Sequence, residues 1–284
     1  MRKITINLAA VAAFCIVVAS PALVSSSCAT PKTEQEDTTI IREDSGITAL
    51  KYSSPEVPTS IEFCGKTIDL SRFDRHERMD RELLAFTYMH STSLQMLKKA
   101  NRYFPIVEPI LKENGIPDDF KYLMVIESNM NPTARSSAGA AGLWQFMQGT
   151  GRDYGLEVNN NVDERYHIEK ATRAACRYLK DAYAKYKDWV AVAASYNAGQ
   201  ARIASQLAKQ DVDDSLDLQL VEETARYVYR ILAAKQLFNA PTTFGFRLRA
   251  SDLYPPIPYT EITVTKGIAD LARFARSKGC LLYT

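Results

Sequence analysis

One acidic residue stands where an apolar helix approaches its end. The stretch DDFKYLMVIE is typical of a helix that begins near Pro117, and Asn131-Pro132 must break it. Residues at the spacing i, i+3, i+4 and i+7 share its core face: Phe120, Leu123, Met124 and Glu127. The carboxyl group of Glu127 is therefore predicted to point toward the protein interior.

A carboxyl group in that position suits general acid catalysis. It can donate a proton near neutral pH only if burial favours the protonated form, and a helix C-terminus acts in the same direction. A glutamate at a helix end is also often a surface or ion-paired group. The residue pattern alone leaves both interpretations open.

The segment after this helix has the composition of a binding loop. ARSSAGAAGLWQFMQGTG is rich in small residues and glycines, which let a backbone approach a ligand closely. Four larger side chains interrupt it: Trp144, Gln145, Phe146 and Met147. Apolar faces and an amide suit a sugar ring with its hydroxyl and N-acetyl groups, so we expect a carbohydrate cleft. Trp144 is equally consistent with a packed anchor of the loop.

Further helices must position these groups. Between 169 and 187 one continuous helical stripe is formed by Ala171, Ala174, Ala175, Tyr178, Leu179, Ala182, Tyr183 and Tyr186. DWVAVAASYN predicts a second helix, ended by a left-handed turn at Gly199, and EETARYVYRILAAKQLF predicts a third from near Val221. Upstream, residues 77–104 are mostly helical, and VEPILKENGIP predicts a separate helix stopped by Asn114-Gly115. The fold is therefore predicted to be mainly α.

Three ordered motifs carry a resemblance to a known family. ESNMNPTARSSAGAAGLWQFMQGTGRDYGL, ASYNAGQARI and EETARYVYRILA closely resemble the soluble lytic transglycosylase (SLT) domain of glycoside hydrolase family 23. The resemblance implies a lysozyme-like helical domain of the goose type, which we expect over residues 95–245. It also implies that the substrate is peptidoglycan and that the chain is a lyase.

The resemblance further implies roles for individual residues. Glu127 matches the catalytic acid of the family's Glu-Ser motif. Eight residues match positions that bind or border the substrate: Ser136, Gln145, Met147, Tyr178, Tyr196, Asn197, Glu223 and Tyr227.

Two departures from the family pattern and three alternative interpretations accompany these matches. Gln148 replaces a proline that often follows the cleft methionine, and Met130 stands where many relatives carry an aromatic residue. Tyr178 and Tyr196 could also be core aromatics, and Glu223 could be an acidic residue favoured by the dipole at a helix N-terminus.

The number of nearby carboxylates bears on the reaction. Retaining glycosidases use two carboxylates about 5 to 5.5 Å apart, and inverting enzymes need a second one to activate water. The stretch 127–147 contains Glu127 as its one acid. A lone carboxylate can act as acid toward the glycosidic oxygen and then as base toward the sugar's own 6-hydroxyl, which attacks the anomeric carbon.

By resemblance, the bond cleaved is the β-1,4 bond between N-acetylmuramic acid and N-acetylglucosamine, and the products carry 1,6-anhydromuramic acid ends. This chemistry needs no metal or cofactor, and the scattered cysteines and histidines give no zinc pattern. Two alternatives remain. One is a goose-type hydrolase, in which Asp163 or Glu164 would supply a second acid. The other is a non-catalytic lipoprotein that binds cell-wall glycan.

The N-terminal residues predict export. Arg2 and Lys3 precede the apolar run LAAVAAFCIVVA, which makes residues 1–27 typical of a signal peptide. Small residues precede Cys28 in a way that resembles a bacterial lipoprotein processing site, and residues 28–54 are polar like a flexible tether. We expect a periplasmic, membrane-anchored lipoprotein of a Gram-negative bacterium, with ordinary signal cleavage as the alternative.

The remaining segments are short. Residues 55–94 are predicted to be a partly helical N-terminal extension that contains the strand-like piece SIEFCGKTIDL, and residues 246–258 a proline-rich linker. A strand and a short helix within 259–284 resemble the start of a LysM-type glycan-binding module without its second strand, through truncation or degeneration. The formal charge of +2, from interleaved acidic and basic residues, argues against a nucleic-acid partner.

Overall fold

The computed structural model describes residues 2–6 and 54–279. The chain divides into two compact units, of which the larger comprises Ser54–Ile257 and the smaller combines Met1–Ser53 with Pro258–Thr284. The proposed lipidation site Cys28, and all of the predicted leader and tether except residues 2–6 and 54, lie outside the described residues.

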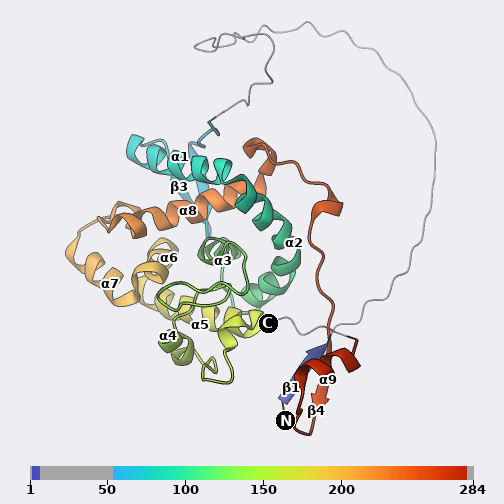
Figure 1. The fold of residues 1–284 in the computed structure, drawn as a ribbon. Helices are drawn as coiled ribbons and strands as arrows, with labels where there is room; N and C mark the ends of the chain where they lie inside the picture. The colour runs from blue at the N-terminus through green and yellow to red at the C-terminus, as the bar shows by residue number, and fades with distance from the viewer. Residues whose placement is uncertain (1, 7–53, 280–284) are drawn as a thin grey trace, which may run out of the picture. The chain divides into compact units, whose positions relative to one another are not determined.

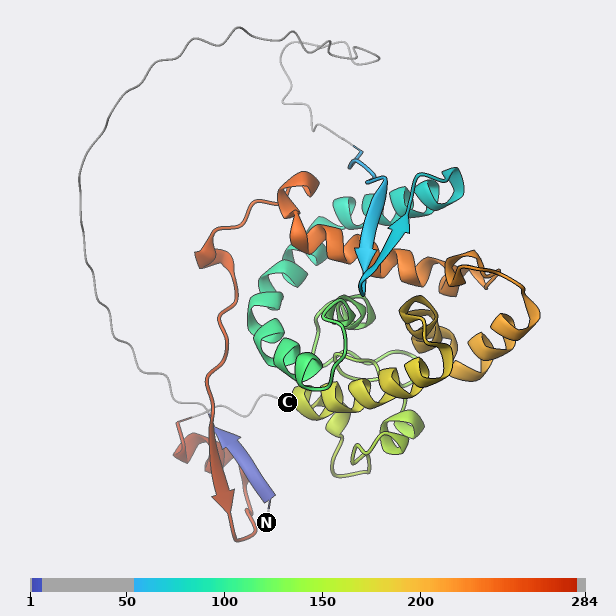
Figure 2. The ribbon, with the colours of Figure 1, turned by 180° about the vertical axis from the view of Figure 1, so that it is seen from behind.

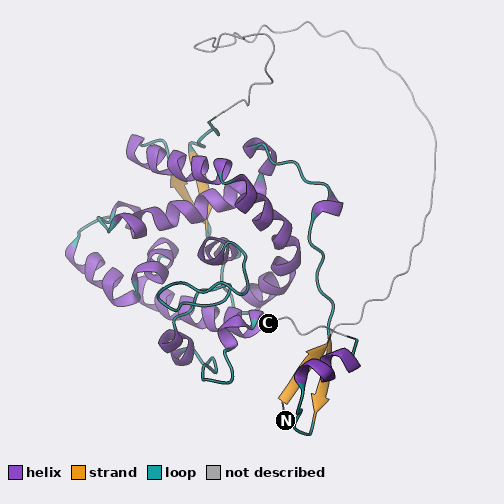
Figure 3. Ribbon diagram, viewed as in Figure 1, coloured by secondary structure: helices purple, strands orange, loops and turns teal. Residues whose placement is uncertain are grey.

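The larger unit is built almost entirely from helices (Figures 1 and 3). Its longer helices are α1 (Phe73–Tyr88), α2 (His90–Glu113), α3 (Phe120–Ser128), α4 (Gln148–Asp153), α5 (Ile168–Tyr186), α6 (Trp189–Ala198), α7 (Gln200–Lys209) and α8 (Glu222–Asn239). Four short 3₁₀ turns join them: η1 (Glu164–Tyr166), η2 (Ser215–Asp217), η3 (Pro241–Phe244) and η4 (Ala250–Asp252). The prediction of a mainly α fold is confirmed.

Helix α3 occupies the middle of this unit. Figures 1 and 2 show it nearly end-on, with α2, α5, α6 and α8 around it. It is apolar on all sides, and the following residues are buried: Phe120, Tyr122, Leu123, Met124, Val125 and Ile126. A helix that is hydrophobic all round is stable only inside a core. The core therefore fixes the end of α3, where Glu127 lies.

The helix patterns predicted from the sequence are partly confirmed. The stripe along 169–187 corresponds to α5, and its alanines and Leu179 are fully buried. The boundary predicted near residue 104 is wrong, because α1 and α2 meet at Met89 and α2 continues through Pro105 and Pro109. Both prolines lie on the exposed side of α2, where water can replace the backbone hydrogen bonds that proline removes.

The segment 55–94 is integrated into the larger unit. The strand-like piece is a hairpin of β2 (Ser60–Phe63) and β3 (Lys66–Asp69), whose turn uses the left-handed backbone of Cys64 and Gly65. Phe63 and Ile68 point into the core, and α1 packs along α8. Together these elements cover one side of the helical core.

The proline-rich segment after α8 follows α2. The backbone N–H of Tyr254 donates to the carbonyl of Lys98 at 3.0 Å, and Asn101 donates back to the carbonyl of Tyr254 at 3.1 Å. Arg102 donates to the carbonyl of Pro255 at 3.0 Å. This part of the predicted linker is therefore attached to the larger unit through main-chain atoms.

The part of the smaller unit that the structure describes, residues 2–6 and 258–279, contains an antiparallel strand pair and a helix. Strand β1 (Arg2–Ile6) pairs with β4 (Thr260–Val264), and α9 (Leu271–Ser277) follows β4. A strand followed by a helix is the order that the sequence predicts for 259–284, and its likeness to a LysM module stays a prediction. Among residues 2–6 and 54–279, no helix combines the length and apolarity needed to cross a bilayer.

Candidate active site

Glu127 is the penultimate residue of α3, and its side chain is half-buried. The helix ends at Ser128, earlier than the predicted break at Asn131-Pro132, because Asn129 and Met130 adopt left-handed backbone with φ of 48° and 59°. Asparagine tolerates this region, whereas for methionine it is uncommon. Met130 is fully buried, so its packing holds the reversal of the chain directly after the acid.

One hydrogen bond orients the carboxylate of Glu127. The hydroxyl of Tyr227, on α8, donates to Oε1 of Glu127. The ring of Tyr227 is buried, so this donor has little freedom to move. The bond therefore links the end of α3 to the first half of α8 and brings the two motifs together in space.

The surroundings tune the acidity of Glu127. Burial raises the pKa of its carboxyl group to about 7, against the hydrogen bond from Tyr227 and the positive charge of Arg230, which lower it. The negative charge of Glu223 raises it further. Near neutral pH the group therefore exists in both forms, as a proton donor and a proton acceptor require.

A cluster of tyrosines adjoins the acid. The ring of Tyr196, on α6, packs against that of Tyr178, on α5, with centroids 5.1 Å apart. Their hydroxyls donate to main-chain carbonyls, that of Tyr196 to Trp144 at 2.8 Å and that of Tyr178 to Ser195 at 2.9 Å. Burial and the charge of Glu127 raise the pKa of Tyr196, and burial raises that of Tyr178 to about 12. Both rings are therefore neutral, and both brace the region around Glu127.

The predicted binding loop provides two accessible residues near its end. Met147 is 45% exposed at the start of α4. Gln145 has a left-handed backbone with φ of 49°, and its amide donates to the carbonyls of Gly142 at 2.7 Å and Ala134 at 3.2 Å. Ser136 is exposed, and its hydroxyl accepts the N–H of Ala140 at 3.0 Å. The side chains of Gln145 and Ser136 thus shape the loop as well as facing its surface.

The aromatic residues of the loop do not offer a face to a sugar. Trp144 is fully buried, and its indole N–H donates to the hydroxyl of Thr172 at 2.9 Å. Phe146 is also buried. The expectation that these rings stack on a ligand is wrong, because both fill the core beneath the loop. Of the two interpretations of Trp144, the packed anchor is the correct one.

A residue missed in the sequence holds the loop in place. Arg165 is fully buried, and it donates to the carbonyls of Gly139 at 2.7 Å and Phe146 at 2.9 Å. Asp163 neutralises it through a bidentate pair at 2.9 and 2.7 Å. No periodic pattern marks this arginine, because its partners are main-chain carbonyls distant in the sequence.

The small residues of the loop serve internal packing. Gly142 has φ of 79°, and a Cβ at this position would lie 1.9 Å from the carbonyl oxygen of Arg165. Glycine is therefore required for contact with the protein's own backbone, where the sequence suggested contact with a ligand.

Helix α8 contributes Glu223 to the site and, through Thr224, holds a second predicted residue, Asn197 of α6. The hydroxyl of Thr224 donates to the side-chain carbonyl of Asn197 at 2.8 Å, which fixes the asparagine at the end of α6. Glu223 is exposed in the first turn of α8, and its charge acts on Glu127. The site thus combines the ends of α3 and α6 with the first half of α8.

The two acids considered for a hydrolase are engaged elsewhere. Asp163 is paired with Arg165, and this hydrogen bond lowers the pKa of its carboxyl group. Partial burial raises the pKa of the Glu164 carboxyl group, but its hydrogen bonds and the nearby positive charge, foremost those of Lys170, together outweigh this effect and lower the pKa below its ordinary value. Both carboxylates are therefore ionised structural partners. Within the described ranges, no group of histidine, cysteine, aspartate and glutamate residues is arranged to hold a metal ion.

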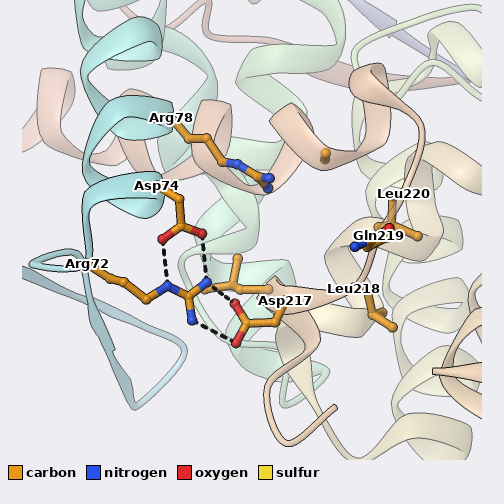
Figure 4. A pocket seen from close by; sticks show the side chains of 9 residues that line it. Arg72, Asp74, Arg78, Asp217, Leu218, Gln219 and Leu220 are labelled. Atoms are coloured by element: carbon orange, nitrogen blue, oxygen red, sulfur yellow. Dashed lines mark hydrogen bonds and ion pairs between the residues drawn. The ribbon is translucent and has the colours of Figure 1, made fainter. Parts of the chain in front are cut away.

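A hollow of about 370 Å³ lies away from Glu127, between α1 and the chain that leads into α8 (Figure 4). Figure 4 shows Arg72 between Asp74 and Asp217, with the guanidinium of Arg78 reaching over the hollow from α1. Arg72 binds Asp74 at 2.6 Å, and Arg75 binds Asp217 at 3.0 Å. These pairs attach η2 to the start of α1 and give the hollow a structural explanation.

Comparisons with known proteins find similarity over the segment that contains Glu127. A family model described as the Transglycosylase SLT domain matches residues 105–217. Over 181 residues the chain is 30% identical to membrane-bound lytic murein transglycosylase D of Escherichia coli K12. This alignment covers 62% of this chain and 39% of that protein. It is 30% identical over 138 residues to peptidoglycan transglycosylase gp16 of phage T7, covering 46% of this chain and 10% of that protein.

Among solved structures, the 70 kDa soluble lytic transglycosylase of Escherichia coli aligns with a TM-score of 0.44 at 18% identity, covering 63% of this chain and 33% of that one. The chain thus spans well under two thirds of the length of these relatives. The family model covers two of the three motifs, at residues 127–156 and 194–203, and the predicted resemblance is confirmed for residues 105–217.

Proposed function

We propose that this chain is a peptidoglycan lytic transglycosylase, because a family model described as the Transglycosylase SLT domain matches its residues 105–217. It cleaves the β-1,4 bond between N-acetylmuramic acid and N-acetylglucosamine and leaves 1,6-anhydromuramic acid ends. The observation that carries the proposal is the half-buried Glu127, oriented by Tyr227 and with a pKa near neutral. A group poised in this way can both give and take a proton in one reaction.

The proposed reaction uses Glu127 twice. Protonated Glu127 donates its proton to the glycosidic oxygen as the bond from that oxygen to the anomeric carbon breaks. The resulting carboxylate takes the proton of the 6-hydroxyl of the muramic acid ring, whose oxygen bonds to the anomeric carbon. No water is consumed, and the proton count on Glu127 is restored. Holding the hydroxyl next to the anomeric carbon makes the attack unimolecular.

The other predicted residues would bind and position the glycan. Met147 offers an exposed apolar side chain, and Ser136 and Gln145 offer polar groups of the loop. Asn197 and Tyr196, braced by Thr224 and the Trp144 carbonyl, would face the sugar near the acid.

Export and membrane attachment are part of the proposal. They rest on the leader-like residues 1–27, on Cys28, and on the similarity to membrane-bound lytic murein transglycosylase D of Escherichia coli. A periplasmic location, with lipid on Cys28, would bring the enzyme to its polymer.

One observation favours a hydrolase as the second candidate. The exposed carboxylate of Glu223 is near enough to Glu127 for its charge to raise the pKa of that group. A second carboxylate beside the acid could activate water, as in inverting glycosidases. The two reactions differ in their products, because a hydrolase releases reducing ends.

The test is mass spectrometry of the fragments that the purified chain releases from peptidoglycan. We expect anhydro ends from the wild type, none from Glu127→Gln, and unchanged product chemistry from Glu223→Gln. Glu113→Gln serves as the matched control, since Glu113 is an exposed carboxylate at the end of α2. Reducing ends that disappear in Glu223→Gln would instead establish the hydrolase, and no release by the wild type would refute both.

A further inference from the structure

Arg230 on α8 forms no hydrogen bond or ion pair with any residue that the structure describes, whereas several neighbouring arginines do. On α8 and the facing α1, several arginines bind carboxylates: Arg75, Arg81 and Arg226. Among the described residues, no carboxylate, carbonyl or hydroxyl accepts a hydrogen bond from Arg230, although its side chain is partly buried. Partial burial removes hydration from a guanidinium, and only an anion or strong acceptor compensates for that loss. Arg230 is therefore suited to an anion supplied from outside the chain.

The position of Arg230 on α8 aligns it with the catalytic groups. Glu223, Tyr227 and Arg230 follow the spacing i, i+4 and i+7 and so share one face of the helix. The hydroxyl of Tyr227, in the middle of this row, binds Glu127. The charge of Arg230 acts on both Glu127 and Tyr227, but it forms no ion pair with the carboxylate. Its guanidinium thus lies beside the acid and remains available to a ligand.

The proposed substrate offers an anion at the corresponding place. The two sugars of the polymer differ because muramic acid carries a lactyl ether that ends in a carboxyl group. This carboxyl is free in peptide-free strands, and in peptide-bearing strands it continues into a stem with carboxylates of its own. The ether lies on the ring whose anomeric carbon reacts, so the anion enters the site next to the acid.

We propose that Arg230 binds a carboxylate of the muramic acid substituent and thereby places muramic acid, rather than glucosamine, at the bond to be cleaved. The inference rests on the proposed function. A guanidinium grips a carboxylate through two parallel hydrogen bonds, which fixes the orientation of the sugar as well as its identity. Arg230 would then be a specificity-determining residue that takes no part in proton transfer.

The experiment measures binding by calorimetry to chains that carry Glu127→Gln, so that no cleavage occurs. Three ligands are compared: a peptide-free tetrasaccharide of alternating N-acetylglucosamine and N-acetylmuramic acid, the same tetrasaccharide with peptide stems, and chitotetraose, which has no carboxyl group. Adding Arg230→Gln should weaken binding of a carboxylate-bearing ligand about tenfold or more and leave chitotetraose unchanged. Arg230→Lys should weaken binding of the carboxylate-bearing ligands by a smaller factor, because lysine keeps the positive charge but lacks the bidentate geometry.

The ligands also identify which carboxylate is bound. If Arg230→Gln weakens binding of the peptide-free tetrasaccharide alone, Arg230 binds the lactyl carboxylate. If it weakens binding of the peptide-bearing tetrasaccharide alone, Arg230 binds a carboxylate of the peptide stem. Arg78→Gln, which removes an exposed arginine of α1 outside the site, should change none of the three affinities. Equal losses for all three ligands on Arg230→Gln, or no loss, would overturn the inference.

Failure of the inference is separable from failure of the proposed function. If the wild type releases anhydro ends but Arg230→Gln does not discriminate between ligands, only the role of Arg230 is refuted. If Arg230→Gln does not fold, the comparison of Arg230→Lys with the parent chain still decides, because a carboxylate contact predicts a selective loss for the carboxylate-bearing ligands.

Discussion

Replacing Glu127 with glutamine should change the stability of the protein in a pH-dependent way. Burial raises the pKa of this carboxyl group from its ordinary 4.5 to about 7. The folded protein therefore holds the proton more tightly than the unfolded chain does. As pH rises from 4.5 to 7, the unfolded state loses the proton first, and the free energy of unfolding of the wild type falls. The shift corresponds to about 3 kcal/mol, reached in full above pH 7.

Glutamine cannot ionise, and it keeps an oxygen that can accept the hydrogen bond from Tyr227. The Glu127→Gln variant should therefore match the wild type near pH 4 and exceed its unfolding free energy by about 3 kcal/mol at pH 8. Urea unfolding of both chains at several pH values measures the difference.

The control is Glu113→Gln, since the Glu113 carboxylate is exposed and paired with Arg173 at the surface. The free energy of unfolding of Glu113→Gln should differ little from that of the wild type at every pH. A difference between Glu127→Gln and the wild type that does not grow with pH would refute the account of Glu127 as a buried, proton-holding acid.

Three further predictions follow from the site and its supports. Tyr227→Phe removes a hydrogen bond to the carboxylate, so the pKa of Glu127 should rise by about one unit, since Arg230, Glu223 and Tyr196 stay in place. The alkaline limb of the pH profile of kcat should move to higher pH by the same amount. An unchanged alkaline limb would exclude Tyr227 as the donor that orients Glu127. Gly142→Ala should cost about 3 kcal/mol or prevent folding, measured by thermal unfolding, because its Cβ would collide with the Arg165 carbonyl; near-native stability would contradict this. Tyr229→Phe should leave stability unchanged or raise it by about 1 kcal/mol, because the buried Tyr229 hydroxyl has no hydrogen-bond partner among the described residues; a loss of stability would reveal a partner for that hydroxyl.

Periodic patterns allowed the helices nearest the site to be predicted. The spacing of Phe120, Leu123 and Met124 placed Glu127 on the inner face of its helix, and the stripe along α5 was likewise correct. The α5 prediction succeeded because burial on one helical face follows directly from the helical repeat. Helix α3 is apolar on all sides, so its composition, more than the spacing of one face, places it in the core. The same reasoning failed at Met89, where no glycine or proline marks the break between α1 and α2.

The loop was harder to predict because its contacts are not periodic. Arg165 satisfies main-chain carbonyls, and carbonyls carry no signature in a sequence. Trp144 was suggested as a sugar-stacking ring from its type alone, yet only the fold shows that it lies under the loop.

The anchoring of the loop by Arg165 has a consequence for redesign of the protein. The guanidinium binds the backbone carbonyls of Gly139 and Phe146, so it makes no demand on the exposed side chains at positions 137 and 138 or on the partly exposed one at position 140. Libraries that vary positions 137, 138 and 140, while Arg165, Asp163 and Gly142 stay constant, should keep the loop's path and yield a high proportion of folded members. The loop is thus a natural starting point for directed evolution of ligand preference.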